Sequence, residues 1–282
     1  MQKMKNLAIV FLSTLVLASC SEYHKVLNKG EVSDQYQMAV KMYEANKYSK
    51  SLRLFEKITP SFRGKPQMER IQYMVANANL NEKNYGLAGY YFDRFATNYP
   101  KSSKKEEADF LSALSYYKAS PSFSLDPTDT NKAINSFQSF IDNYPDSDRI
   151  EEANKYYNEL RFKLEKKDFE IAKTYYRTAE YDYRNYQASI AAFDNLLEDY
   201  LGTKYKEEAL YYRFKASHDF AVKSVTQKKG ERIKAAEKAY EKFKKNFPES
   251  KFKKESDEMY ATLQTEKEQL DKIKNRLQLI KS

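Results

Sequence analysis

Small and aromatic residues recur along this chain at fixed distances from four short stop signals. The signals read Asn or Asp, an aromatic residue, Pro (once Leu), any residue, then Ser or Thr, at Asn98–Ser102, Asn143–Ser147, Asp199–Thr203 and Asn246–Ser250. Eight positions before the third residue of each signal stands an aromatic residue: Phe92, Phe137, Phe193 or Tyr240. A small residue stands twelve positions before it, at Ala88, Ala133, Ser189 and Ala236. Another stands eight positions after it, at Ala108, Ala153, Ala209 and Ser256. Agreement at three positions in four segments indicates an internal repeat.

The spacing within one repeat predicts two helices with a break between them. Residues four apart share a helix face, so Ala88 lets a neighbouring helix come close and Phe92 fills the space beside it. Pro100 ends the helix because it lacks an N–H and clashes with the preceding turn. The Ser or Thr of each signal stands where an N-cap belongs, and Ser103 with Glu106 has the spacing of a capping box. We therefore expect a second helix directly after each signal.

An earlier segment follows the same spacing, with Ser51 and Phe55 in the places of Ala88 and Phe92. Its first helix is expected over Ser33–Asn46. We predict an all-α fold, a right-handed helical solenoid of about five helix pairs. The units run roughly over 33–66, 67–102, 103–147, 148–203 and 204–250. A C-terminal helix over 251–282 carries an apolar stripe, and it either caps the solenoid or docks a partner.

The longest stretch of loop composition lies between Lys118 and Thr130. It is rich in Ser, Pro and Asp, which favour turns. It is expected to join the two helices of the third unit. Its apolar residues Phe123 and Leu125 either pack back on the solenoid or form a contact site.

The first twenty residues have the layout of an export signal. Lys3 and Lys5 are followed by an apolar run of about 11 residues, whereas a transmembrane helix needs roughly 20. The run ends in Leu17-Ala18-Ser19-Cys20, which resembles the bacterial lipobox. We predict a signal peptide over 1–19, a lipid on Cys20 and a lipidated tether over 20–32. Ser21 is not the Asp that favours inner-membrane retention, so the periplasmic face of the outer membrane is expected.

Composition supports a helical, disulfide-free chain with an uneven charge. Only 6 Gly and 7 Pro occur in 282 residues, Trp is absent, and Cys20 is the only cysteine. Of the net charge of +9, the segment from Lys223 onward carries +7, with 17 Lys and Arg against 10 Asp and Glu. Export argues against nucleic acid as the partner of this basic segment. An acidic protein surface, anionic lipid head groups or a merely solvated face remain open.

No catalytic or metal-binding constellation is present. The two histidines, His24 and His218, have no spaced ligand partners, and His218 is expected to be a packed or surface residue. The chain has no Gly-rich phosphate loop and no nucleophile elbow. Its carboxylates are spread among lysines on helical surfaces. We therefore expect no enzyme activity, no cofactor and no metal.

The helix pairs resemble tetratricopeptide repeats, in which an aromatic, a small residue and a second aromatic precede a Pro. Tyr85, Ala88, Phe92 and Pro100 match this pattern. With the lipobox, the five units and the run from Tyr144 to Ala153, the chain resembles the BamD family, the lipoprotein subunits of the outer-membrane β-barrel assembly (BAM) machinery. The resemblance covers essentially the whole chain after Cys20.

The resemblance implies a scaffold without enzyme activity that promotes protein insertion into the outer membrane. Its C-terminal repeats would bind the barrel-forming BamA subunit, whose periplasmic domains would meet the basic segment. Its N-terminal repeats would bind unfolded outer-membrane proteins in a groove. Of the N-terminal tyrosines, Tyr43 and Tyr73 are the ones we expect to line that groove.

Two other classes of protein share some of these features. A periplasmic tetratricopeptide adaptor for peptidoglycan synthesis or cell division usually carries an N-terminal coiled coil, and no long heptad run lies between Cys20 and Ser33. A glycan-binding outer-membrane lipoprotein usually binds sugars on Trp side chains, and this chain has none. A generic scaffold of another partner is the remaining alternative.

Overall fold

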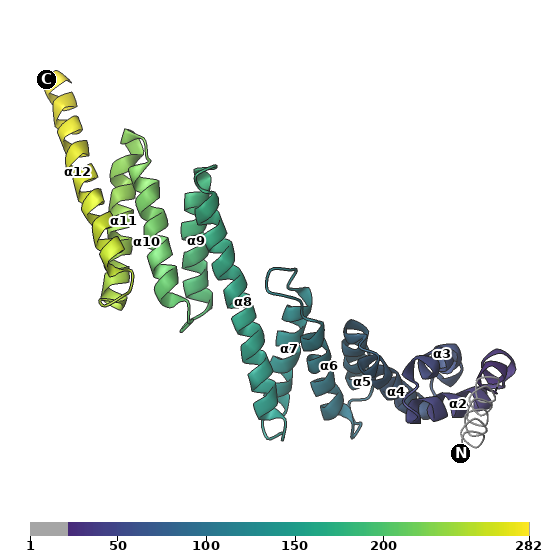
Figure 1. Ribbon diagram of the computed structural model, residues 1–282. Coiled ribbons are helices and arrows are strands. Elements are labelled where there is room, and N and C mark those ends of the chain that lie inside the picture. The colour runs from purple at the N-terminus through teal and green to yellow at the C-terminus, as the bar shows by residue number, and fades with distance from the viewer. Residues whose placement is uncertain (1–21, 282) are drawn as a thin grey trace, which may run out of the picture. The chain divides into compact units, whose positions relative to one another are not determined.

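Helices form almost all of the described chain. The computed structural model describes residues 22–281, and of residues 277–281 only the backbone (Figure 1). The predicted signal peptide and Cys20 lie outside these residues. The helices are α2 Val32–Glu44, α3 Tyr48–Ile58, α4 Gln67–Asn81, α5 Tyr85–Asn98, α6 Lys105–Ala119, α7 Thr128–Asn143, α8 Ile150–Thr178, α9 Arg184–Asp199, α10 Lys206–Val222, α11 Thr226–Asn246 and α12 Lys253–Lys281, with a 3₁₀ turn, η1, at Thr59–Phe62. No strand occurs between residues 22 and 281, which confirms the predicted all-α class.

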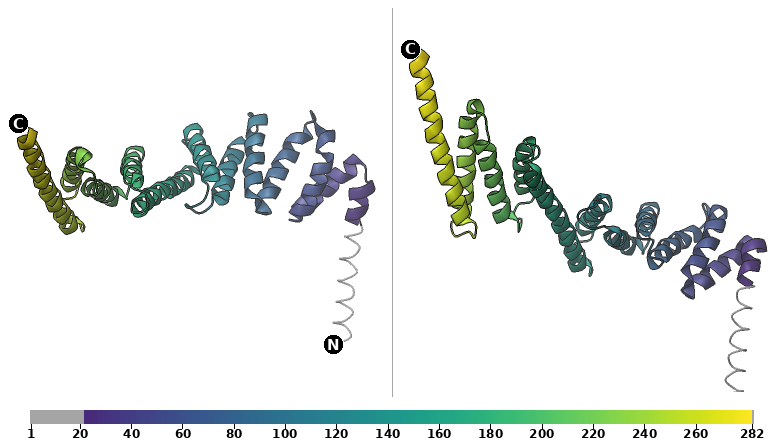
Figure 2. Two further views of the ribbon diagram at one scale, coloured as in Figure 1. Left: turned by 90° about the horizontal axis from the view of Figure 1, so that it is seen from above. Right: turned by 45° about the horizontal axis from the view of Figure 1, so that its top comes forward.

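The chain divides into two compact units, Met1–Leu160 and Arg161–Ser282, and helix α8 contributes to both. We call them the N-terminal unit and the C-terminal unit. Within the N-terminal unit the pairs α2–α3, α4–α5 and α6–α7 pack side by side, and α5 packs on α6 (Figure 2). Within the C-terminal unit α10 packs on α9, α11 and α12. The 29 residues of α8 account for the wide spacing before the fourth stop signal.

The repeated small and aromatic positions form the cores. Their side chains are buried in every unit: Ser51, Phe55, Ala88, Phe92, Ala133, Phe137, Ser189, Phe193, Ala236, Tyr240, Ala108, Ala153, Ala209 and Ser256. In the N-terminal unit, Phe110 of α6 meets Phe137 and Phe140 of α7 edge-on, with ring centroids 6.1 and 5.4 Å apart. Such edge-to-face contacts add to the hydrophobic stabilisation of burial. The predicted role of both position types is confirmed.

The Ser or Thr of each stop signal has a different role from the one predicted. Helix α6 has Lys104 as its N-cap and no side-chain capping bond, so the capping box of Ser103 with Glu106 is absent. Instead, the Ser147 hydroxyl accepts the N–H of Arg149 and donates to Glu106 at 2.6 Å. The same pair of contacts links Thr203 to Tyr205 and Glu165, and Ser250 to Phe252 and Glu207. The hydroxyl stabilises a turn and ties it to the first helix of the same pair, where a carboxylate is the better acceptor.

The aromatic residue of the stop signal makes a second tie of this kind. The Tyr144 hydroxyl donates to Asp109 at 2.8 Å, and Lys105 donates to the same hydroxyl at 2.9 Å. In the C-terminal unit, Tyr200 donates to Asp168 at 2.9 Å. The signal therefore ends the second helix of a pair and also ties that end to the first helix of the same pair.

The signal that lacks Pro still stops its helix. Gly202 has φ +82, a left-handed conformation that glycine adopts without strain, and α9 ends at Asp199. Leu201, which replaces Pro, is almost fully exposed. The turn at Gly202 thus ends the helix here, as Pro does in the other repeats.

The segment expected to be a tether is packed where the structure describes it. Residues 22–29 are helical, and Tyr23 is buried in the first hydrophobic cluster. The Tyr23 hydroxyl donates to the carbonyl of Lys50 in α3, and the Gln35 amide donates to the carbonyls of Val26 and Leu27. Tyr23 and Leu27 are four apart and form one apolar face, which the short segment did not make evident. A free tether over 22–32 is therefore the wrong description.

The expected loop between α6 and α7 is shorter than its composition indicated, because α6 ends at Ala119 and α7 begins at Thr128. Thr130 is buried in the first turn of α7, and its hydroxyl pairs with that of Ser120 at 2.6 Å. Phe123 is half-buried, and Leu125 is exposed.

Two neighbouring alanines of α11 test the small-residue position. Ala236→Leu places extra methyl groups in a closed helix contact and should lower the free energy of unfolding by about 1–3 kcal/mol. Ala235→Leu, on the exposed side of the same turn, should change it by less than about 0.5 kcal/mol. Urea unfolding followed by circular dichroism measures both. Equal effects of the two changes would contradict the assigned packing.

Candidate binding surfaces

Tyr43 and Tyr73, the residues predicted to line a peptide groove, lie on the first helices of two neighbouring pairs. Tyr43 belongs to α2 and Tyr73 to α4. Asn77, one turn beyond Tyr73, donates a hydrogen bond to the Tyr43 hydroxyl. Tyr43 also meets the ring of Tyr48 edge-on, with centroids 5.6 Å apart. Both predicted residues are half-buried, so only part of each ring is available to a ligand.

Charged residues at the start of α6 complete this tyrosine surface. Tyr73 hydrogen-bonds to Glu107, and the Lys104 ammonium lies 5.5 Å from the Tyr73 ring centroid. Burial raises the pKa of the Tyr73 phenol, and the Glu107 carboxylate raises it further, so the phenol is a neutral donor. Burial alone would raise the pKa of Glu107, but hydrogen bonds from Lys104 and Tyr73 outweigh it and lower that pKa. The polar groups of this surface therefore satisfy one another.

A cleft lies on the side of α4 that faces away from Tyr73. It is bounded by α3 and α5, the second helices of the first two pairs. We call it the α3–α5 cleft. It has a volume of about 630 Å³, within the range typical of ligand pockets. Its apolar lining comes from three helices: Leu52 of α3, Ile71 and Val75 of α4, and Leu87 and Tyr91 of α5. Leu87 is 53% exposed although it is a large apolar residue.

Charged side chains surround the apolar lining of the cleft. Arg63, Arg94 and Glu56 line it as well. Arg94 donates to the Tyr90 hydroxyl at 3.2 Å, and neither arginine forms an ion pair with a carboxylate of residues 22–281. The cleft thus combines an apolar floor with two cations that are open to an anionic group.

Sequence reasoning missed this cleft, although one signal for it exists. Ala88, Phe92 and Phe95 already account for the buried face of α5. Leu87, Tyr91 and Arg94 form a second stripe with the i, i+4, i+7 spacing of one helix face. A second apolar stripe on a helix whose core face is complete indicates a contact outside the core.

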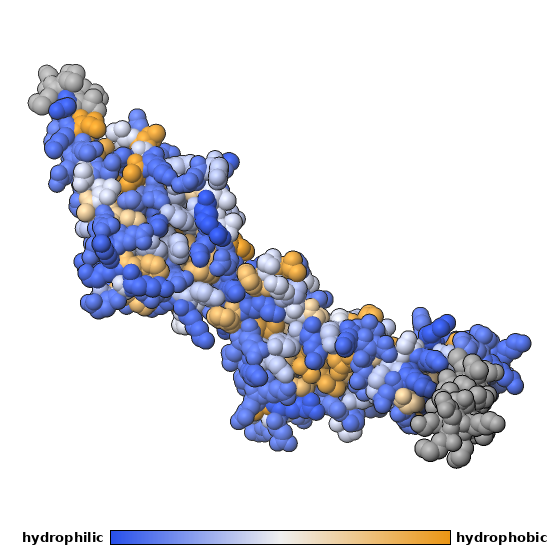
Figure 3. All heavy atoms as spheres, viewed as in Figure 1, coloured by the Kyte–Doolittle hydropathy of each residue, from blue (hydrophilic) through white to orange (hydrophobic). Residues whose placement is uncertain are grey.

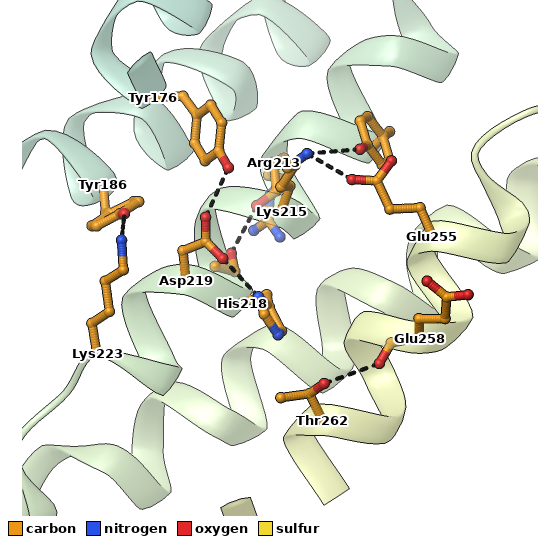
Figure 4. Close-up of polar contacts among 12 residues, drawn as sticks. Tyr176, Tyr186, Arg213, Lys215, His218, Asp219, Lys223, Glu255, Glu258 and Thr262 are labelled. Carbon is orange, nitrogen blue, oxygen red and sulfur yellow. Dashed lines mark hydrogen bonds and ion pairs between the residues drawn. The ribbon is translucent and has the colours of Figure 1, made fainter. Parts of the chain in front are cut away.

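In the C-terminal unit, polar side chains join α8, α10 and α12 (Figure 4). The Tyr176 hydroxyl donates to Asp219 at 2.7 Å, and Nδ1 of His218 lies 2.8 Å from the other carboxylate oxygen of Asp219. Lys215 donates to Glu255 at 2.7 Å and to Tyr211 at 3.2 Å. These contacts connect three helices, with Asp219 and His218 largely buried and Glu255 exposed.

The His218–Asp219–Tyr176 cluster is held together by hydrogen bonds to one carboxylate. Nε2 of His218 is buried without a hydrogen-bond partner among residues 22–281. Burial alone would raise the pKa of Asp219, but hydrogen bonds from His218 and Tyr176 outweigh it and lower that pKa. The ionised carboxylate therefore holds the two neighbours in place. The packed position expected for His218 is confirmed.

Residues 22–281 contain no group of three or more His, Cys, Asp or Glu side chains able to hold a metal ion. None of their helices is both long and apolar enough to cross a membrane. Figure 3 shows a mainly hydrophilic face with apolar atoms in separate patches.

Comparison with known proteins identifies the family of this fold. The model of the YfiO outer membrane lipoprotein family matches residues 28–233. The chain belongs to this family. The match extends over α2 to α10 and therefore includes the α3–α5 cleft and the His218 cluster.

Two curated relatives are named as outer membrane protein assembly factors. The outer membrane protein assembly factor BamD of Haemophilus influenzae is 23% identical over 185 residues, 62% of this chain and 70% of that protein. The putative outer membrane protein assembly factor BamD of Aquifex aeolicus is 26% identical over 222 residues, 74% of this chain and 67% of that protein. The resemblance to the BamD family inferred from the repeats is thereby confirmed.

The Asp219 carboxylate provides a pH-dependent test of the polar cluster. Asp219→Asn should lower the free energy of unfolding at pH 7 by about 1–3 kcal/mol, because Asn lacks the charge that accepts both hydrogen bonds. Since the folded-state pKa of Asp219 is lowered, its stabilisation is present above about pH 4 and is lost as pH falls through the folded pKa. The difference between the two proteins should therefore shrink in acid.

The matched control for this change is Asp271→Asn, which alters an exposed carboxylate of α12. It should leave stability nearly unchanged at both pH values. Denaturant unfolding at a series of pH values measures all three proteins. A deficit of Asp219→Asn that stays constant down to acid pH would show that the charge of Asp219 is not what matters.

Proposed function

We propose that this protein is a lipid-anchored scaffold, without enzyme activity, of the machinery that assembles outer-membrane β-barrel proteins. In this proposal the N-terminal unit binds unfolded barrel proteins and the C-terminal unit binds a BamA-like barrel subunit. Membership of the outer membrane lipoprotein family, with relatives named as assembly factors, supports the general role. Cys20 carries the lipid and holds the scaffold at the periplasmic face of the outer membrane.

The α3–α5 cleft is the observation that carries the substrate-binding part of the proposal. Strands of outer-membrane barrels alternate apolar and polar side chains. An extended segment of this kind would place apolar side chains against Leu87, Tyr91 and Val75. Its carboxylates would face Arg63 and Arg94, which charge-assisted contacts favour. Tyr43 and Tyr73 remain the proposed residues of a second contact on the opposite side of α4.

The charge of the C-terminal unit supports the partner-binding part. The chain from Lys223 onward carries a net charge of +7. An acidic periplasmic domain would be drawn to this unit at a faster rate and in a defined orientation, which is the main effect of complementary charge. Within the same unit, the hydrogen bond from Tyr176 to Asp219 ties α8 to α10.

Affinity capture from detergent-solubilised outer membrane tests the proposal, with Leu87→Glu as the decisive variant. The unchanged protein should recover a large barrel protein with periplasmic domains together with unfolded barrel proteins. Leu87→Glu places a charge in the cleft and should lower recovery of the unfolded proteins about tenfold while leaving the large barrel subunit bound.

Thr97→Glu is the matched control, because Thr97 is exposed on the same helix, does not line the cleft and receives the same charge. It should leave recovery of both partners unchanged. Capture of only cell-division, peptidoglycan or glycan-uptake proteins would overturn the assembly role. Equal losses with the two variants would overturn the assignment of the cleft.

A further inference from the structure

One edge of the C-terminal unit exposes an apolar side chain at each of three places. The α8–α9 turn, the α10–α11 turn and the last turns of α12 lie on the same side of this unit (Figure 1). They carry Tyr181, Val225 and Ile273, whose exposed fractions are 92%, 62% and 45%. We call these three residues, with Lys228, Lys272 and Lys274, the turn edge. None of the three apolar residues lines the clefts found in residues 22–281.

Cations surround two of these apolar residues. Lys228, Lys272 and Lys274 are exposed, and none of them pairs with a carboxylate among residues 22–281. The Lys274 ammonium lies 3.5 Å from the position that a Cβ atom would occupy on Gly230. The end of α12 therefore packs beside the first turns of α11, and the lysines of the two helices share one surface.

The neighbouring acids do not cancel this charge. Residues 223–232 contain four Lys and Arg against one Glu, and residues 268–276 contain three against two. Beside Tyr181, the Asp182 carboxylate is already paired with Arg184 at 2.8 Å. The turn edge thus favours an anionic partner.

The arrangement fits a lipid surface better than a folded protein. Protein partners bind mainly through clustered side chains in well-packed pockets. Here the apolar residues stand singly at the ends of helices, with flexible lysines between them. Anionic head groups attract each lysine near the surface, while Val, Ile and Tyr side chains enter the boundary between head groups and acyl chains. Tyr is enriched at that depth because its ring is apolar and its hydroxyl is polar.

We propose that the turn edge binds the phosphate-bearing head groups of an anionic lipid bilayer, as a contact additional to the lipid on Cys20. This inference rests on the proposed location at a membrane. An anchor raises the local concentration of lipid around the whole chain, so a weak second contact becomes occupied. The contact would fix how the C-terminal unit faces the membrane, which a single lipid on Cys20 does not do.

Vesicle co-sedimentation tests the contact without the anchor. The chain from residue 20 onward with Cys20→Ser should bind vesicles of phosphatidylcholine and phosphatidylglycerol, but not vesicles of phosphatidylcholine alone. Binding should weaken as salt is raised, because salt screens exposed charges. Lack of binding to the anionic vesicles at low salt would overturn the proposal.

Two triple variants with the same charge change locate the contact. Replacing Lys228, Lys272 and Lys274 by Glu should lower vesicle binding at least about tenfold. Replacing Lys238, Lys242 and Lys245 by Glu, which alters exposed lysines further along α11, should lower it much less. Ile273→Ser should weaken binding with no change of charge. Circular dichroism confirms that each variant folds.

Equal losses with the two triple variants would show a general charge effect and overturn the turn edge as the site. A turn-edge variant that binds vesicles normally but loses capture of the barrel subunit would overturn the lipid assignment in favour of a protein contact. Because vesicle binding uses no other protein, its failure leaves the assembly role untouched. The capture experiment can likewise fail while vesicle binding holds.

Discussion

The close contact between helices at one small residue per unit is the constraint on which the rest of the structure depends. Ala88, Ala133 and Ala236 are completely buried, and an aromatic ring four residues later fills the space beside each. A larger side chain at the small position would hold the helices apart, and the ring would lose its contacts. The spacing of the second helices follows from this contact. The α3–α5 cleft is the space that remains between two of them over α4.

The stop signals fix how the two helices of a pair align along each other. Their contacts also engage many polar side chains of the surface. Ser147 and Tyr144, which follow α7, bind Glu106 and Asp109 of its partner helix α6, and Ser250 binds Glu207 in the same way. Carboxylates engaged in this way are not available to partners. The groups that remain are apolar side chains such as Leu87 and Val225, and lysines without a carboxylate partner. Function is assigned to these groups because the fold leaves them unused.

Periodic features could be predicted from the sequence and local alternatives could not. Residues equivalent to Ala88 and Phe92 recur in every unit, so the burial of these positions could be predicted from their spacing alone. The hydroxyl of Ser147 had two possible partners, an N-cap amide and a carboxylate 41 residues earlier, and only the packed structure decides between them. Tyr23 stood in a segment too short to show a pattern. The second stripe of α5 indicates a contact outside the core, but the α3–α5 cleft itself joins Leu87 to Leu52 of another helix, which only the packed structure shows.

The apolar cleft of the N-terminal unit is the proposed binding site for unfolded barrel proteins. Site-specific photo-crosslinking in living cells is the sharpest test, with a photoreactive amino acid in place of Leu87 or, as the control, of Thr97 on the same helix. We expect adducts with newly made outer-membrane barrel proteins from position 87 and few from position 97. Equal adducts from both positions, or adducts from position 87 with other proteins only, would contradict this proposal.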